Sequence, residues 1–591
     1  MSVLSSVMEI KSVGPEPDME AIRIARWWQD WKNKKGPWER EAEWRRDYIF
    51  ATDTKTTQNV HLPWKNSTTT PKLCQIRDNL HANYMSALFP NEEWLSWEGD
   101  NVDAVAVAVK KSIEGYMRDK LRAINFKNDV SRLIYDYIDY GNAFAAVEYV
   151  SDSMIGPEGE HVPKYSGPVV TRISPFDIVF DINASNFKRS PKIIRSVISI
   201  GELQADADRL VGDKAKDFQA AVEKLRTFRV TITRNSWEDI RKKSGITKDG
   251  FGDIQSWANS PEVEILTFYG DLYIADTDTL LKDHKVVILD RRFVLSSEPI
   301  DSLEGEAPIH HVGWRLRPDN LLAMGPLDNL VGLQYRIDHL ENLRADMMDM
   351  TAFPMVKVKG DSVEDFVFAP TEQIHMDSDD DVEFMRPDTT ALNADLQINR
   401  HMEVMEEMAG SPKQAMGFRT PGEKTAFEVS VLENAAGRIF QNKIRHFEEV
   451  FMEPLVNTMF AQSIRNAGAF DTVREVSPQD GSVDFRDIKI EDLKHSGRLR
   501  PVGARHFVEK AQAVQNLNQI FASPFAADEL FLAHWSPLQM AKAVEDLLDL
   551  EKFGMVSQNI RIVEAAETAS MQDAASQQVQ RESLVDVEEE Q

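Results

Sequence analysis

The residues that come closest to a catalytic motif lie at the end of the loop at residues 410–424. Residues 417–425 read Gly-Phe-Arg-Thr-Pro-Gly-Glu-Lys-Thr, near the pattern G-x-x-x-x-G-K-T, whose backbone amides cradle a phosphate. Glu423 stands where that pattern needs its lysine and would bring a carboxylate to the phosphates. The preceding residues form a methionine-rich helical pattern, whereas the motif requires a buried strand. We therefore expect no catalytic residues here, and a nucleotide-hydrolysing enzyme is kept as an alternative hypothesis.

Other residues that could hold a metal or act as nucleophiles lack suitable partners. His310 and His311 have no carboxylate or cysteine at ligand spacing, which favours structural histidines. The acidic run from Asp377 to Asp381 lacks the glycine and closing glutamate of a calcium loop and predicts a solvated turn. Cys74 lies in an apolar helical pattern and is expected to be a buried thiol. The sequence predicts neither a metal site nor a cofactor.

Composition limits the class of protein. The chain has 591 residues, a formal charge of -28 and 42% hydrophobic residues, as expected for a globular protein of roughly three or four domain-sized units. So acidic a chain does not coat nucleic acid with a broad basic surface, and any DNA contact must be local. Its single cysteine excludes an intramolecular disulfide framework. Without a signal-peptide pattern or a window of ~20 apolar residues, we expect no membrane association.

The elements that position these residues begin with helices. Five tryptophans between residues 27 and 44 alternate with basic and acidic residues, which favours an amphipathic helix pair with buried tryptophans over a nucleic-acid surface. Further helices are predicted at 73–88 and within 103–140, the last ending at Gly141, where a left-handed conformation is tolerated. Strands are predicted at 143–150, 169–173, 178–182, 193–200, 263–269, 272–274, 286–289 and 293–295.

Residues 325–464 are dominated by long helical patterns. Gly325 and Pro326 would open a helix that runs to residue 351, because proline is tolerated in a first turn. Short strands and turns are expected at 352–389, and a second helix with a methionine stripe at 390–409. The apolar spacing predicts that the two helices have neighbours along their length. The residues expected to pack there are Leu330, Leu333, Ile337, Leu340, Met347, Leu396, Met402 and Met405.

A very long helix is predicted after the basic loop, at residues 425–464. Its ~40 residues correspond to roughly 60 Å, and Pro454 should kink it because proline removes a backbone donor. Strands are expected between 473 and 490 and helices from 504 to about 566. The last residues, 568–591, are rich in Gln, Ser and Glu, a composition typical of mobile tails.

Several motifs follow one another in a characteristic order. They are Arg315-Leu-Arg-Pro-Asp-Asn-Leu-Leu-Ala-Met-Gly-Pro, Ile337-Asp-His-Leu-Glu-Asn-Leu, the Gly417 loop and Glu453-Pro-Leu, with supporting matches at Tyr140-Gly-Asn-Ala and Ile173-Ser-Pro-Phe-Asp. In this order the chain resembles the portal, or head-tail connector, proteins of short-tailed double-stranded DNA bacteriophages. The resemblance covers nearly the whole chain, except the tryptophan cluster and residues 235–252.

This resemblance implies an α+β, mainly helical fold that assembles as a ring of about twelve subunits around a DNA channel. The parts it implies are a wing (1–324), a first stem helix (325–351), a clip (352–389), a second stem helix (390–409), a tunnel loop (410–424), a long wing-to-crown helix with following strands (425–499) and a crown (500–591). The tunnel-loop residues implied to meet DNA are Lys413, Gln414, Phe418, Arg419 and Lys424.

The implied function is not enzymatic. The ring would form the channel at one capsid vertex through which double-stranded DNA is packaged and ejected. Its partners would be the terminase, then tail or adaptor proteins, together with major capsid and scaffold proteins. Such a protein belongs to the virion, and to the host cytoplasm during assembly. An acidic wall would let DNA slide past, while the loop cations would supply weak, salt-sensitive contacts. A capsid or scaffold protein without a channel is a further alternative.

Overall fold

A computed structural model of the chain describes most residues between 18 and 502. The described ranges are 18–50, 66, 68–90, 94–100, 107–155, 161–199, 201, 262–274, 278–300, 306–352, 355–359, 382–385, 393–409, 442–466, 470–476, 483–489 and 493–502. They form a mixture of α-helices and antiparallel sheets, as the sequence predicts. Contacts divide the chain into two compact units, residues 1–469 with 490–501 and residues 470–489 with 502–591. Within the described residues, no helix has the length and apolar character needed to cross a bilayer.

The first unit contains a five-stranded antiparallel sheet with the order β4-β5-β6-β7-β8. Its strands are β4 (Ile178–Phe180), β5 (Lys192–Ser199), β6 (Glu262–Ile274), β7 (Thr279–Leu289) and β8 (Phe293–Pro299). Alternation along β4 shows that both faces of the sheet are buried, since successive side chains point to opposite faces. Val179 joins one apolar core, whereas Ile178 and Phe180 join another.

Helix α1 (Met19–Ile49) covers the first of these faces. Ala21, Ile24 and Trp28 recur at helical spacing and lie in one core with residues of the sheet. The predicted helix pair is wrong, because α1 continues through Pro37. An ion pair between Lys32 and Glu39, 2.8 Å apart, bridges the proline and joins the two halves of the helix.

Tertiary contacts anchor α1 near the same proline. Lys35 is buried and donates to the carbonyl oxygen of Ile178 at 2.7 Å, and its burial lowers its pKa to about 7. The prediction that the tryptophans are buried is correct only in part. Trp28 is fully buried, while Trp44 is 51% exposed. The buried side of α1 therefore includes Lys35, whereas Trp44 lies at the surface.

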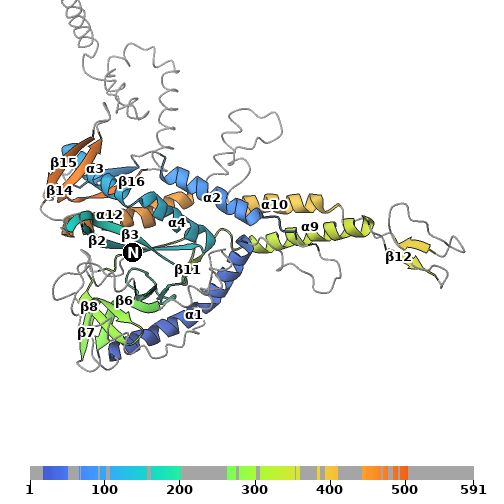
Figure 1. Ribbon diagram of the computed structural model, residues 1–591, viewed down its shortest axis with the longest axis horizontal. Coiled ribbons are helices and arrows are strands. Elements are labelled where there is room, and N and C mark those ends of the chain that lie inside the picture. The colour runs from blue at the N-terminus through green and yellow to red at the C-terminus, as the bar shows by residue number, and fades with distance from the viewer. Residues whose placement is uncertain are drawn as a thin grey trace, which may run out of the picture. The chain divides into compact units, whose positions relative to one another are not determined.

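A three-stranded sheet with the order β3-β2-β9 lies against the second face. Its strands are β2 (Asn142–Ile155), β3 (His161–Ile173) and β9 (Ile309–Gly313). Helices α4 (Phe126–Asp139) and α12 (Glu453–Asn466) contact β2 and β3. Figure 1 shows the resulting succession of α1, the two sheets and these helices. The strands predicted from sequence therefore occupy the centre of this unit.

Shorter elements complete the unit. Helices α2 (Lys72–Leu88) and α3 (Val107–Ala123) both contact α4. Strand β1 (Leu95–Gly99) pairs with β16 (Gly497–Pro501). Strands β10 (Arg315–Arg317) and β11 (Asn320–Met324) form a hairpin. Before α12, residues Glu448–Met452 form a π-helical turn, η3. A π-turn, in which the hydrogen-bond ladder widens, therefore lies just before Pro454, where the sequence predicts a kink.

The second unit is described only in part. Strands β14 (Phe470–Val476) and β15 (Val483–Lys489) pair along seven residues in an antiparallel hairpin. The predicted helices from 504 to 566 and the tail after them lie outside the described residues.

Candidate functional site

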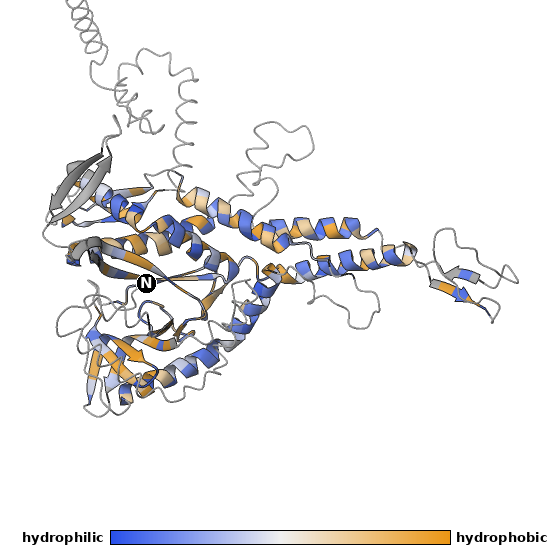
Figure 2. Cartoon of the chain, viewed as in Figure 1, coloured by the Kyte–Doolittle hydropathy of each residue, from blue (hydrophilic) through white to orange (hydrophobic). Residues whose placement is uncertain are grey.

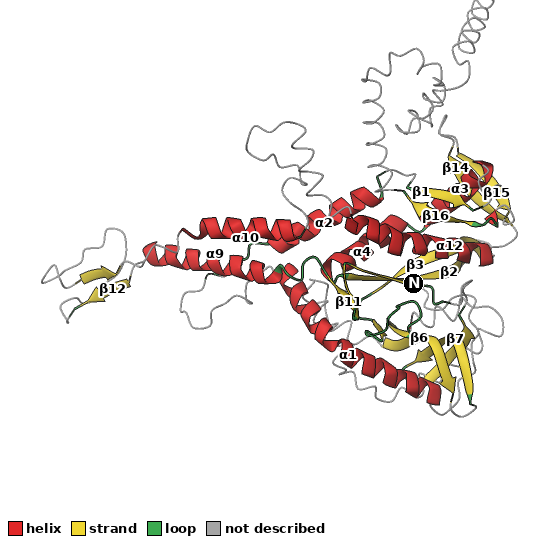
Figure 3. Ribbon diagram, turned by 180° about the vertical axis from the view of Figure 1, so that it is seen from behind, coloured by secondary structure: helices red, strands yellow, loops and turns green. Residues whose placement is uncertain are grey.

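Two helices, α9 (Val331–Ala352) and α10 (Asp395–Met408), contact each other and lie side by side in both ribbon views (Figures 1 and 3). They are antiparallel, because Arg344 near the end of α9 pairs with Asp395 at the start of α10. The chain between them contains the antiparallel hairpin of β12 (Met355–Val358) and β13 (Val382–Met385). The pair is therefore a helical hairpin interrupted by a strand hairpin.

The predicted helix boundaries shift in the structure. Residues 326–330 form turns, and α9 begins only at Val331. Gly325 meets Gly141, where φ is +70°, so closely that a Cβ at position 141 would collide with the backbone of Gly325. This approach fixes the start of α9 against the end of α4. The predicted left-handed conformation at Gly141 is confirmed.

Asn142 holds the same junction together. Its side chain is fully buried and makes four hydrogen bonds. The amide nitrogen donates to the carbonyl oxygens of Tyr140 at 3.0 Å and Ala323 at 2.9 Å. The amide oxygen accepts from the Ala323 backbone at 2.9 Å and from His311 Nε2 at 3.0 Å. One side chain thus ties β2 and β9 to β11, the strand that precedes the turns leading into α9.

The eight residues predicted to pack the helices differ in exposure. Buried are Leu330, Ile337, Leu340 and Met405; half-buried are Leu333, Met347 and Met402. Leu396 is 82% exposed. Within one chain, Leu396 therefore does not pack in a core.

A second face of α9 was missed from the sequence. It carries a polar residue at every fourth position, which places these residues on one stripe of the helix. All four are buried: Gln334, Asp338, Asn342 and Asp346. We call them the α9 ladder. The spacing was visible in the sequence, but the apolar spacing of the same helix was given priority.

The α9 ladder binds the backbone of residues 66–70, which precede α2. Asp346 accepts from the Asn66 amide at 2.9 Å, Asn342 from Thr68 at 2.8 Å and Asp338 from Thr70 at 3.0 Å. Amides two residues apart, at 66, 68 and 70, thus meet side chains four residues apart on the helix, a rise of about 6 Å per step. Burial raises the pKa of Asp338, against the hydrogen bonds that Gln334 and Thr70 donate to it.

Gln334 also caps α2 from outside that helix. The residue before α2, Pro71, forms no side-chain cap. Gln334 Oε1 accepts from the Leu73 amide at 3.2 Å, while its Nε2 donates to the carbonyl oxygen of Thr70 at 2.6 Å. An amide that would otherwise lack a helical partner is thereby satisfied. The start of α2 is thus coupled to the start of α9.

The end of α10 reaches the same point on α2 through an ion pair. Lys72 Nζ pairs with Glu406, and both side chains are buried, at 10% and 5% exposure. Lys72 also donates to Gln75 at 3.0 Å. Because a buried charge is stable only when it is paired, this contact is specific. The first turn of α2 therefore holds both helices of the pair.

The surface of the pair combines acidic charge with exposed apolar side chains. The sequences of α9 and α10 contain eight Asp and Glu residues against three Arg. Asp338, Asp346 and Glu406 are buried, so five of these carboxylates lie at the surface. Four large apolar residues are nevertheless 43–82% exposed: Tyr335, Met348, Leu396 and Met408. Figure 2 shows such hydrophobic positions among the hydrophilic ones along both helices. Both helices therefore carry apolar side chains that a partner surface could bury.

Other predicted site residues have different outcomes. His310 is buried and His311 is half-buried, and desolvation lowers the pKa of each to about 3. The rings of His311 and Phe144 stack at 4.5 Å, so the structural interpretation of the histidines is confirmed. Cys74 is only half-buried, which corrects the prediction of a buried thiol. Its neighbour Leu73 faces the core instead, and partial burial with the nearby Asp78 carboxylate raises the pKa of the thiol.

The predicted DNA-contacting residues cannot be placed from this structure. Lys413, Gln414, Phe418, Arg419 and Lys424 lie outside the described residues, as does the acidic run at 377–381. Among the residues that are described, no group of three or more His, Cys, Asp or Glu side chains could hold a metal ion. No protein-family model matches the chain, and no curated protein matches it significantly.

Proposed function

We propose that this protein is a phage portal protein, a ring around a channel through which double-stranded DNA enters and leaves a capsid. The observation that carries the proposal is the α9–α10 helical hairpin. It is acidic, exposes apolar side chains on both helices and contains a strand hairpin between them. This order of parts matches the stem and clip that the sequence resemblance implies. Residues 1–324 would then serve as the wing.

The exposed apolar residues support assembly from many copies. Leu396 and Met348 would remain in water in a single chain, at 82% and 53% exposure. Burying a large apolar side chain stabilises an interface by about 1.5–3 kcal/mol. A contact that joins different surfaces of identical copies repeats around an axis and forms a ring where the rotation closes, or a filament where it does not. In the proposed ring, each helical hairpin lies against the hairpin of the next copy.

The acidic charge of the same helices supports passage of DNA. A wall rich in carboxylates repels phosphates, so a duplex would slide along it without adhering. The contacts of Lys413, Arg419 and Lys424 with DNA remain a prediction. So do the docking of terminase and tail proteins at the β12–β13 hairpin and the presence of about twelve subunits.

The proposal is tested by imaging the purified full-length chain. Class averages from electron microscopy, together with particle masses, should show closed rings with a central hole. Leu396→Glu should abolish the rings, because it places a charge in the interface between copies. Leu280→Glu is the matched control, since Leu280 is 52% exposed but lies on β7.

Three results would contradict the proposal. One is a chain that stays monomeric under conditions of capsid assembly. Another is identical behaviour of the Leu396→Glu and Leu280→Glu variants. The third is ATP turnover that is lost on Lys424→Ala, which would support the enzymatic alternative.

A further inference from the structure

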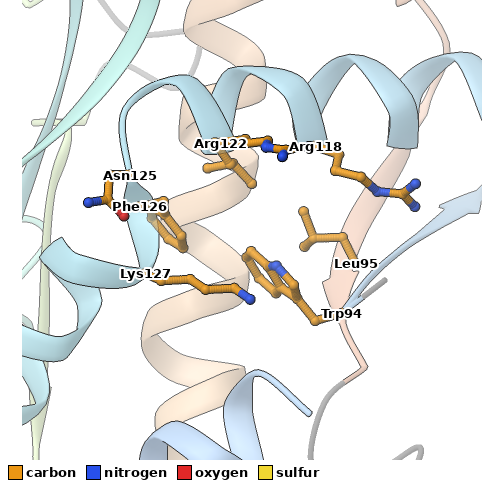
Figure 4. Close-up of a pocket in the computed structure, with 8 residues that line it drawn as sticks. Trp94, Leu95, Arg118, Arg122, Asn125, Phe126 and Lys127 are labelled. Atoms are coloured by element: carbon orange, nitrogen blue, oxygen red, sulfur yellow. The ribbon is translucent and has the colours of Figure 1, made fainter. Parts of the chain in front are cut away.

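A pocket of about 240 Å³ lies between the end of α3, the start of α4 and strand β1. Its floor consists of the buried side chains of Trp94, Leu95, Leu121 and Phe126, each at most 8% exposed. Trp94 and Phe126 stack in parallel with ring centroids 5.7 Å apart. Figure 4 shows these two rings with Lys127 extended beside them. The pocket is thus apolar at its base and open to long polar side chains.

The rim of the pocket is cationic. Arg118, Arg122 and Lys127 line it, all three are exposed, and no carboxylate is among the lining residues that the structure describes. Arg122 forms no ion pair within the described part of the chain, and Lys127 lies over the Phe89 ring at 5.6 Å. In a chain with a formal charge of -28, such a concentration of positive charge is local. The rim is therefore complementary to negative charge.

Size and chemistry together define the ligand. The volume is that of about eight water molecules, which suits one amino-acid side chain and is smaller than most drug-sized pockets. An apolar floor under a cationic rim would hold an apolar group that has carboxylates around it. A nucleobase fits less well, because stacking needs an open ring face. Trp94 and Phe126 are only 6% and 2% exposed, so neither ring offers an open face.

We propose that this pocket docks an acidic peptide segment of another protein, with one apolar side chain on the Trp94–Phe126 floor and its carboxylates at Arg122 and Lys127. The inference is independent of ring formation, because every residue that it uses belongs to one chain. It assigns a protein-binding site to the α3–α4 end of the first unit, away from the α9–α10 pair.

The test uses the full-length chain and a fluorescein-labelled peptide, Glu-Asp-Glu-Leu-Asp-Glu-Asp, followed by fluorescence anisotropy. Replacing the peptide leucine with alanine should weaken binding roughly tenfold to a hundredfold, the equivalent of losing one buried apolar side chain. The variant Arg122→Ala/Lys127→Ala should weaken it about tenfold through two lost charge contacts. Added salt should reduce affinity for the native chain more than for this variant, because salt screens the charges.

The control Lys282→Ala/Arg292→Ala removes two exposed cations of the β7–β8 region and should leave affinity unchanged. Both Arg122 and Lys127 are exposed, so their substitution should preserve the fold, and circular dichroism checks this. Equal binding of the leucine and alanine peptides would overturn the proposal. So would equal losses in the two double variants, or displacement of the peptide by a DNA oligonucleotide of the same charge. Binding that appears only after residues 582–591 are deleted would also overturn it, since the occupant would then be the chain's own acidic end.

Discussion

Removal of Lys72 from its buried pair with Glu406 should release α10 from the rest of the first unit. Lys72→Met keeps most of the volume of the side chain but removes its charge. Glu406, whose side chain is only 5% exposed, would then lose its cation. Breaking a buried ion pair on one side costs about 3–5 kcal/mol, because the remaining charge is desolvated and unpaired. The lost free energy should destabilise the docking of α10, because Glu406 lies near the end of that helix.

The free energy for local opening of α10 should fall by this amount. Since each 1.4 kcal/mol is a factor of ten, amide hydrogens of α10 should exchange about two to three and a half powers of ten faster. Hydrogen–deuterium exchange followed by mass spectrometry of peptides within 395–408 measures this directly. Amides of β6, in the five-stranded sheet, should keep their native rates and serve as the internal reference.

A second variant separates charge from packing. Lys72→Met/Glu406→Leu replaces the pair by apolar side chains, a change that is often neutral or stabilising, so exchange in α10 should return close to the native rate. Lys357→Met is the control, because Lys357 pairs with Glu383 at 64% and 67% exposure and exposed pairs contribute about 1 kcal/mol or less. If the double variant opens as readily as Lys72→Met, the unpaired charge is not the cause and the reasoning is refuted.

Two further predictions concern the junction at the base of α9. Asn142→Ala should destabilise the fold by about 3–4 kcal/mol, because it leaves several buried polar groups without partners. The control Asn186→Ala, at an exposed turn, should destabilise it by less than about 1 kcal/mol. Thermal unfolding of the two variants measures the difference. Burial lowers the pKa of His310 and His311 from 6.5 to about 3, so the unfolded state binds more protons and stability should decrease as pH falls from about 6.5 toward 3, by up to about 2.7 kcal/mol per pH unit. A His310→Gln/His311→Gln variant should show a shallower decrease in unfolding temperature over that range, and an unchanged slope would contradict the assignment.

Local pattern was sufficient for the central strands and most helices. The short apolar run around Ile178–Phe180 predicts a strand. The structure places these residues in the five-stranded sheet, with both faces of the strand buried. Strands β1 and β16 were not predictable in the same way. Each has five residues, and Leu95 pairs with Pro501, about 400 positions away in sequence. Such pairing depends on the folded unit more than on the sequence of either strand.

The errors in the helices have a common physical cause. A proline-containing stretch was expected to divide α1, but the Lys32–Glu39 pair and the buried Lys35 hold it as one helix. Propensity was overridden by tertiary contacts. In the candidate site, apolar spacing predicted the partner helix of α9. It did not predict that the polar stripe of α9 binds the backbone of Asn66, Thr68 and Thr70, because these residues are about 270 positions away in sequence.

The geometry of the α9 ladder sets a limit on its own length. Each step advances about 6.0 Å along the helix, whereas two residues of any chain can span up to about 7 Å, so the mismatch can reach about 1 Å per step. Successive fourth residues also rotate by about 40° around the helix axis. From Gln334 to Asp346, three steps, the stripe has turned by about 120°. Because the stripe turns away, a longer segment would gain no further contacts with α9. A segment shifted by two residues would meet the donors and acceptors of the α9 ladder in a different order. The backbone amides of Asn66, Thr68 and Thr70 are therefore held in a single register along α9.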